Sequence, residues 1–117
     1  MLICGCDPTY QVDYKVINST EESIKILVDY YGNPSDTNVI SAGTTLTFLN
    51  DFGIGHSTSD FLDDLEFLPV GLSIFDKAGH SYNKNEEDIS NWHKFYPPKK
   101  SDGIGDVELT VQPEDFE

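Results

Sequence analysis

The chain has 117 residues, of which 38% are hydrophobic and 12% aromatic, and its formal net charge is −14. This length suits one domain with one core, and the apolar content excludes a disordered acidic chain. Such an acidic surface repels phosphate backbones, so we expect no nucleic-acid partner.

Both cysteines lie at the N-terminus, in the run Ile-Cys-Gly-Cys that ends at Cys6. A disulfide between Cys4 and Cys6 would be strained, and no histidine or cysteine follows at the spacing of a zinc site. The run resembles a bacterial lipobox, in which a diacylglycerol is attached to the cysteine. This resemblance implies that Cys6 carries the lipid, that residues 1–9 are a lipobox remnant and tether, and that Met1 lies inside a signal peptide. The alternative is a cytosolic protein that begins with two cysteines.

Four strands are predicted in the first half of the chain. Apolar and polar residues alternate over 10–16 and again over 24–31, which is typical of half-buried strands. We expect these two strands to form a hairpin across the turn between them. Shorter strands are predicted over 37–40 and 45–49, with a tight turn between them in which Gly43 is free to take a positive φ.

The second half of the chain has fewer regular elements. Residues 51–65 are predicted to form a loop, in which Ser59 is expected to cap a single turn of helix. A buried strand is predicted over 72–75. Asn85 is predicted to cap a further helix of one or two turns, because acidic residues follow it. The alternation over 107–111 predicts the closing strand.

These segments predict an all-β protein, namely an immunoglobulin-like antiparallel β-sandwich of about seven strands with one short helix. The sandwich should span residues 10–112, and residues 113–117 should form a polar tail. The Cys…Trp…Cys spacing of antibody domains is absent, so only the architecture is predicted. The core is expected to draw on Val12, Tyr14, Ile24, Ile26, Val28, Leu46, Phe48, Leu72, Ile74, Val107, Leu109 and Val111.

The order of features along the chain supports a family resemblance. A truncated lipobox and a Tyr-rich first strand are followed by Asn-Ser-Thr, an Ile-x-Ile-x-Val strand and an Ala-Gly turn. A Trp-containing segment and the ending Val-Gln-Pro-Glu-Asp-Phe complete the order. This order resembles the small predicted lipoproteins of Bacteroidetes-type bacteria and spans most of the chain. The resemblance implies a β-sandwich at the cell envelope, lipid-anchored at the outer membrane, with an unassigned function and no catalytic residues.

Neither a catalytic arrangement nor a cofactor is predicted. No serine lies in a Gly-x-Ser-x-Gly turn, and the roles of nucleophile and base cannot be assigned. Carboxylates in a loop suit calcium, but those of the central loop lack the ordered spacing of an EF-hand. The competing interpretation is a charged loop that keeps a β-protein soluble. The carboxylates concerned are Asp60, Asp63, Asp64 and Glu66.

Aromatic side chains in the irregular region before the closing strand form a candidate ligand platform. Flat aromatic faces stack on sugar rings, so a glycan-binding accessory domain is the main alternative function. The competing interpretation is that the single tryptophan closes the open end of the sandwich as part of the core. An exposed tryptophan would favour the platform, and a buried one would remove it. The platform would consist of Tyr82, Trp92, His93 and Tyr96.

The sequence therefore predicts a non-catalytic interaction or structural module of the cell envelope. The lipid would hold it at the membrane, and its loops would contact a protein partner of unknown identity. We expect those contacts in the loop 51–65. A calcium-binding protein and an unrecognised enzyme remain as further alternatives.

Overall fold

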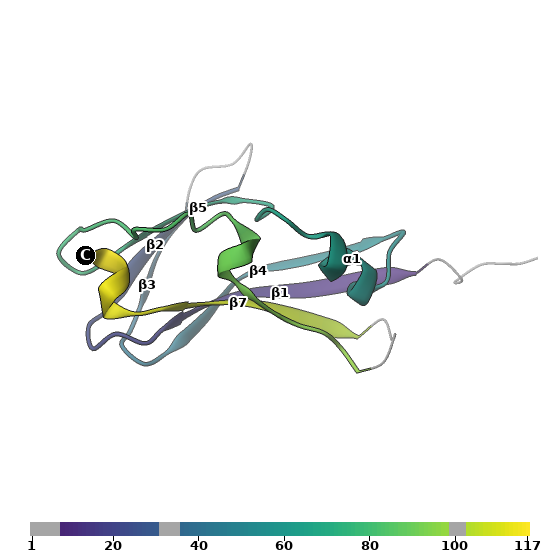
Figure 1. The fold of residues 1–117 in the computed structure, drawn as a ribbon, viewed down its shortest axis with the longest axis horizontal. Helices are drawn as coiled ribbons and strands as arrows, with labels where there is room; N and C mark the ends of the chain where they lie inside the picture. Colours follow the sequence, from purple (N-terminus) through teal and green to yellow (C-terminus); the bar gives the residue numbers. More distant parts are fainter. Residues whose placement is uncertain (1–7, 31–35, 99–102) are drawn as a thin grey trace, which may run out of the picture.

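The computed structural model describes residues 8–30, 36–98 and 103–117, and the predicted lipid attachment site Cys6 lies outside these ranges. Figure 1 shows that β1 begins at the end of the molecule where α1 lies, and that the C-terminus lies at the opposite end. The elements are β1 (Thr9–Asn18), β2 (Ile24–Asp29), β3 (Asp36–Ile40), β4 (Thr45–Ile54), α1 (Thr58–Asp64), β5 (Gly71–Phe75), η1 (Ile89–Asn91), β6 (His93–Phe95), β7 (Ile104–Val111) and η2 (Pro113–Phe116), where η denotes a 3-10 helix.

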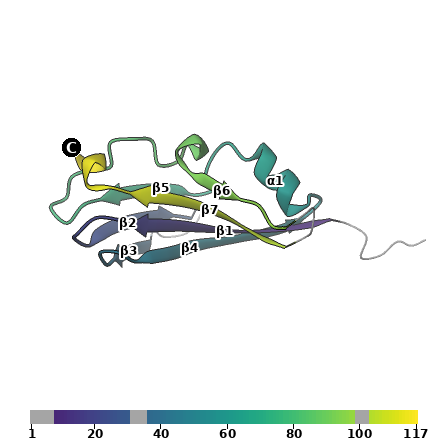
Figure 2. The ribbon, with the colours of Figure 1, turned by 60° about the horizontal axis from the view of Figure 1, so that its bottom comes forward.

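The strands form two sheets (Figures 1 and 2). One sheet has the order β4-β1-β7-β6 and the other has the order β3-β2-β5. The pair β1–β7 is parallel, and every other neighbouring pair is antiparallel. A mostly β chain in two sheets with one short α-helix confirms the all-β prediction, whereas the parallel pair β1–β7 corrects the expectation of a purely antiparallel sandwich.

One core is built from alternate residues of both sheets. Because side chains of a strand point to opposite faces in turn, each central strand contributes one apolar row. Val12, Tyr14 and Val16 of β1 are fully buried, and β2 and β7 contribute similar rows to the same cluster. Every predicted core residue is buried except Leu46, which is half-buried against that cluster.

The predicted hairpin between the first two strands is wrong. β1 and β2 belong to different sheets, and the fully buried Asn18 at the end of β1 turns the chain from one sheet to the other. Its side-chain nitrogen Nδ2 donates to the backbone carbonyls of Glu22 (2.8 Å) and Ile40 (3.0 Å). Its side-chain oxygen accepts from the amide of Thr20 (2.9 Å). These bonds stabilise the connection that carries the chain from one sheet to the other, so β1 and β2 do not pair.

Two corrections concern the stretch predicted as a loop. Residues 51–54 continue β4, and Gly53 suits this strand because the Tyr10 ring occupies the space of a side chain, 2.7 Å from an ideal Cβ. The cap of α1 is Ser57 rather than Ser59. The Ser57 hydroxyl accepts a hydrogen bond from the amide of Asp60 (3.1 Å), which places Ser59 inside the first turn.

Two further corrections concern the segment before the closing strand. The helical turn there is η1, which is capped by Asp88 and not by Asn85. The Asp88 carboxylate accepts from the amide of Ser90 (3.0 Å), whereas Asn85 accepts from the amide of Glu87 (3.0 Å) in the preceding turn. Strand β6 was not predicted, because three residues are too few to display an alternation.

The chain end predicted as a polar tail folds back on the core as η2. Asp115 is only 3% exposed, accepts from the amide of Gln112 (2.8 Å) and forms an ion pair with Lys84 (3.1 Å). The ring of Phe116 packs edge-on against Tyr82 at 6.4 Å between centroids. These contacts close the end of the sandwich opposite α1 (Figure 1).

Candidate functional site

Trp92 belongs to the core. Its side chain is 7% exposed, and its ring lies 6.0 Å from that of Phe48. The indole nitrogen donates to the carbonyl oxygen of Glu86 at 2.8 Å. This burial matches the core interpretation of the single tryptophan and leaves no free indole face for a sugar.

The remaining residues of the predicted platform do not form one exposed face with Trp92. Tyr82 is buried at the opposite end beside η2, and burial raises its pKa to about 12. His93 and Tyr96 are exposed, but the Tyr96 hydroxyl is engaged as a donor to Asp63 (2.7 Å). The four side chains therefore divide into two core residues and two surface residues.

The predicted carboxylate cluster does not form a metal centre within the described residues. In the ranges 8–30, 36–98 and 103–117, no group of three or more His, Cys, Asp or Glu side chains is placed to hold a metal ion. Asp60, Asp63 and Asp64 lie on α1, and Glu66 follows the helix.

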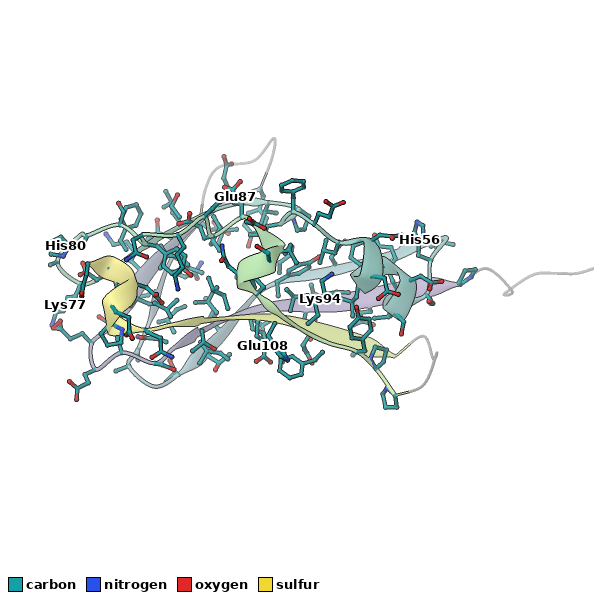
Figure 3. The ribbon with its side chains drawn as sticks, viewed as in Figure 1. His56, Lys77, His80, Glu87, Lys94 and Glu108 are labelled. Atoms are coloured by element: carbon teal, nitrogen blue, oxygen red, sulfur yellow. The ribbon has the colours of Figure 1, made fainter. Side chains whose placement is uncertain are left out.

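A cleft of about 640 Å³ separates the end of α1 from η1 and β6. Its lining includes residues of the predicted carboxylate cluster and of the predicted aromatic platform, together with Lys94. The Lys94 ammonium donates to the carbonyls of Leu62 and Leu65 (3.1 Å for the latter), and Figure 3 shows Lys94 between η1 and α1. A cation suits the C-terminal end of a helix, so Lys94 fastens α1 to β6. The predicted residues lining this cleft are Asp63, Glu66, Trp92 and His93.

The free edge of β5 is covered by two carboxylates. The amides of Leu72 and Ile74 donate to the side chains of Glu87 and Glu86, each at 3.2 Å. Glu87, labelled in Figure 3, also accepts through its backbone carbonyl from the amide of Leu68 (3.0 Å). Burial raises the pKa of Glu86. The segment that holds Trp92 in the core thus closes one edge of the sheet β3-β2-β5.

Strand β4 forms the edge of the other sheet, and a tyrosine hydroxyl binds one of its carbonyls. A β-bulge at Phe48 interrupts the register, since Tyr14 faces Leu49 while Lys15 faces Thr47. The Tyr30 hydroxyl donates to the carbonyl of Phe48 at 2.8 Å. Over residues 49–54, β1 is the only described strand that pairs with β4. We call residues 49–54 the open β4 edge.

The outer face beside the open β4 edge exposes three large apolar side chains, next to the polar pair of Asn50 and Asp13. Phe52 and Ile54 are 72% and 71% exposed, and Ile104 of β7 is 51% exposed. Gln11 pairs with both Phe52 and Ile104, so the three side chains share one row across the sheet. A shallow groove of about 610 Å³ runs over this end of β1 and β4. Large apolar side chains that are exposed together typically mark a binding surface.

The inner face of the open β4 edge holds two polar groups without partners. Asp51 is half-buried, and no described residue forms a hydrogen bond or ion pair with its carboxylate. Tyr14, a diagonal neighbour across the β1–β4 pair, is fully buried, and its hydroxyl has no hydrogen-bond partner in the described part of the chain. Burial raises the pKa of both groups. An unmet hydrogen bond at a buried group costs free energy, so both would gain from a partner.

Part of this surface was accessible to sequence reasoning. The exposed Phe52 and Ile54 fall within 51–65, where partner contacts are expected, although as strand rather than loop. Asp51 was missed. The alternation of Phe48, Phe52 and Ile54 assigns Asp51 to the solvent face, and the β-bulge at Phe48 reverses this phase in the structure.

The comparisons with known proteins give no family. No family model, no curated protein and no solved structure matches this chain. Across residues 8–30, 36–98 and 103–117, there is no helix long and apolar enough to cross a bilayer.

Proposed function

We propose that this chain is a non-catalytic interaction module of the bacterial cell envelope, tethered at the outer membrane by a lipid on Cys6. The lipobox-like run supports the tether. We further propose an immunoglobulin-like architecture in the broad sense, supported by seven strands in two packed sheets. Its strand order, β4-β1-β7-β6 with β3-β2-β5, differs from that of antibody domains.

The apolar surface at the open β4 edge is the observation that carries the interaction function. Phe52 and Ile54 project from a rigid sheet, and side chains on a rigid scaffold bind without a large ordering cost. Thr9 at the start of β1 pairs with Ile54, so this surface lies where the chain enters the fold (Figure 1). A lipid on Cys6 would therefore keep the surface close to the membrane.

Intact mass and membrane partition test the tether. The gene is expressed with its native upstream sequence in a bacterial host, and the mature product is analysed. We expect cleavage before Cys6, added acyl mass and recovery in the membrane fraction. An unmodified product that retains Met1 would overturn the tether.

Photo-crosslinking in the native host tests the interaction surface. A photoreactive phenylalanine analogue replaces Phe52 in one variant and Val39 in a matched variant. Val39 is 67% exposed on β3, an edge strand of the other sheet. We expect a discrete adduct from position 52 and none from position 39. Equal adducts from both positions, or none from position 52, would overturn the interaction surface.

A further inference from the structure

We propose that the open β4 edge binds an extended segment of another polypeptide as an added strand, and that a Lys or Arg of this segment faces Asp51. The proposal rests on the interaction function proposed above and specifies its partner as a segment in which basic and apolar residues alternate.

The backbone supports strand addition at this place. An edge strand presents a row of unpaired N–H and C=O groups that a further strand can use. Elsewhere side chains bind such groups: Glu86 and Glu87 accept from amides of β5, and Tyr30 donates to the Phe48 carbonyl of β4. The described edges at β3 and β6 are short, with five and three residues. Residues 49–54 contain neither proline nor lysine, and their one charge is the inward-facing Asp51, which disfavours an added strand unless that strand brings a cation.

The inner face supports a basic residue in the partner. A residue directly opposite Asp51 on an added strand would lie within about 4.5–5.5 Å between Cβ atoms. A cation opposite this half-buried carboxylate complements its charge, and close charge pairs across an interface couple favourably.

The outer face supports apolar residues at the alternate positions. Of the two residues next to the one facing Asp51, one points outward beside Phe52 and the other beside Asn50, and the outward position after Phe52 lies beside Ile54. The net charge of −14 attracts a basic segment and opposes pairing with a second copy of the same chain. Charge therefore favours a basic partner over self-association.

Binding of an eight-residue Lys-Val alternating peptide tests the proposal directly. The full chain is titrated with the peptide, and backbone amide shifts and calorimetric affinity are measured. We expect shifts concentrated in residues 49–54 and an affinity that falls with added salt. A Glu-Val peptide of equal length should not bind. A Lys-Val peptide that is N-methylated at alternate residues should not bind either, because it cannot form the ladder.

Charge variants of Asp51 provide the second arm. Asp51→Asn should weaken Lys-Val binding about tenfold or more, the loss expected when a close charge pair is removed. The matched variant Asp36→Asn, on the exposed edge strand β3, removes the same charge and should bind as the wild type. Asp51→Lys should weaken Lys-Val binding more than Asp51→Asn does, because it places a second cation opposite the lysine of the peptide.

The possible outcomes separate this proposal from the function on which it rests. Equal binding of the methylated peptide, or no effect of the Asp51 variants, would overturn strand addition at this edge. Dimers in sedimentation experiments, with amides 49–54 protected in the absence of peptide, would make a second copy the occupant. If the peptide fails while position 52 still crosslinks a partner, strand addition falls and the interaction function stands. If both fail, both proposals fall.

Discussion

The indole of Trp92 contacts the rest of the protein through its ring and through its N–H group. The ring packs on Phe48, and the N–H donates to the carbonyl of Glu86. Trp92→Phe keeps an aromatic ring but leaves that carbonyl without its donor and opens a small cavity. We expect the free energy of unfolding to fall by about 2–4 kcal/mol, measured by urea denaturation. Tyr96→Phe, which removes an exposed bond to Asp63, is the control and should stay near the wild-type value; similar losses in both variants would contradict this assignment.

Tyr14 and Tyr30 offer a matched pair of hydroxyl deletions. The buried Tyr14 hydroxyl has no partner among the described residues, so Tyr14→Phe removes a desolvation cost and should leave stability unchanged or raise it by about 1 kcal/mol. The Tyr30 hydroxyl donates to Phe48, so Tyr30→Phe should cost about 1 kcal/mol. In thermal and urea unfolding, only Tyr30→Phe should lose stability. A loss in Tyr14→Phe as large as that in Tyr30→Phe would show that the Tyr14 hydroxyl is satisfied.

Among the elements, the short helix α1 depends most on its ends. Ser57 caps its N-terminus, and Lys94 binds the carbonyls at its C-terminus. Ser57→Ala should lower the free energy of unfolding by about 1 kcal/mol, because an amide of the first turn loses its acceptor. Ser59→Ala, inside the same turn, is the control and should change stability little. Equal effects of the two variants, measured by chemical denaturation, would contradict the assignment of the cap.

Sequence periodicity predicted the elements but not their partners. β1, β2 and β7 were recognised because apolar residues alternate over at least five positions in each. The end of β4 was missed because Gly53 normally weakens a strand, and only the Tyr10 ring from β1 explains its place. Strand pairing depends on residues far apart in the chain, so the hairpin error followed from considering neighbours alone.

The same limit applies to the candidate site. The region 51–65 was predicted as the place of partner contacts, and it contains Phe52 and Ile54. The role assigned to Asp51 required knowledge of which face of β4 lies inward and which residues of β1 lie opposite. The predicted platform failed because tertiary packing draws Trp92 into the core, which composition alone does not decide.

For the whole molecule, we expect stability to fall as the pH rises from mildly acidic values. Burial raises the pKa of Asp51 and of Glu86 above their ordinary values of 3.8 and 4.5. The folded state therefore binds protons that the unfolded chain has released, so these groups favour folding below those values and lose that contribution as the pH rises. The pKa values of Asp76 and Asp88 are lowered, so these carboxylates stabilise the folded state above pH 3.8 and lose that contribution as the pH falls further. For Asp76, desolvation is opposed by hydrogen bonds from His80; for Asp88, hydrogen bonds from Ser90 lower the pKa.

Urea denaturation from about pH 4.5 to 7 measures this dependence. The free energy of unfolding should decline across the range, because repulsion among the ionised carboxylates adds to the effect. Glu86→Gln retains an oxygen that can accept from Ile74 and should flatten the decline. Glu114→Gln, at an exposed position on η2, is the control. A stability that rises with pH, or an unchanged slope in Glu86→Gln, would contradict the expected role of these groups.

The parallel pairing of β1 with β7 places the first and last strands side by side at the centre of one sheet. Gln11 of β1 pairs with Ile104 of β7, so about ninety residues are synthesised after β1 before the strand beside it begins. Until then, β1 has only β4 to pair with, and a second unpaired edge is exposed to other chains. Contacts between such distant segments also make folding slow. The sheet β4-β1-β7-β6 therefore cannot be completed until synthesis has passed Ile104, where β7 begins.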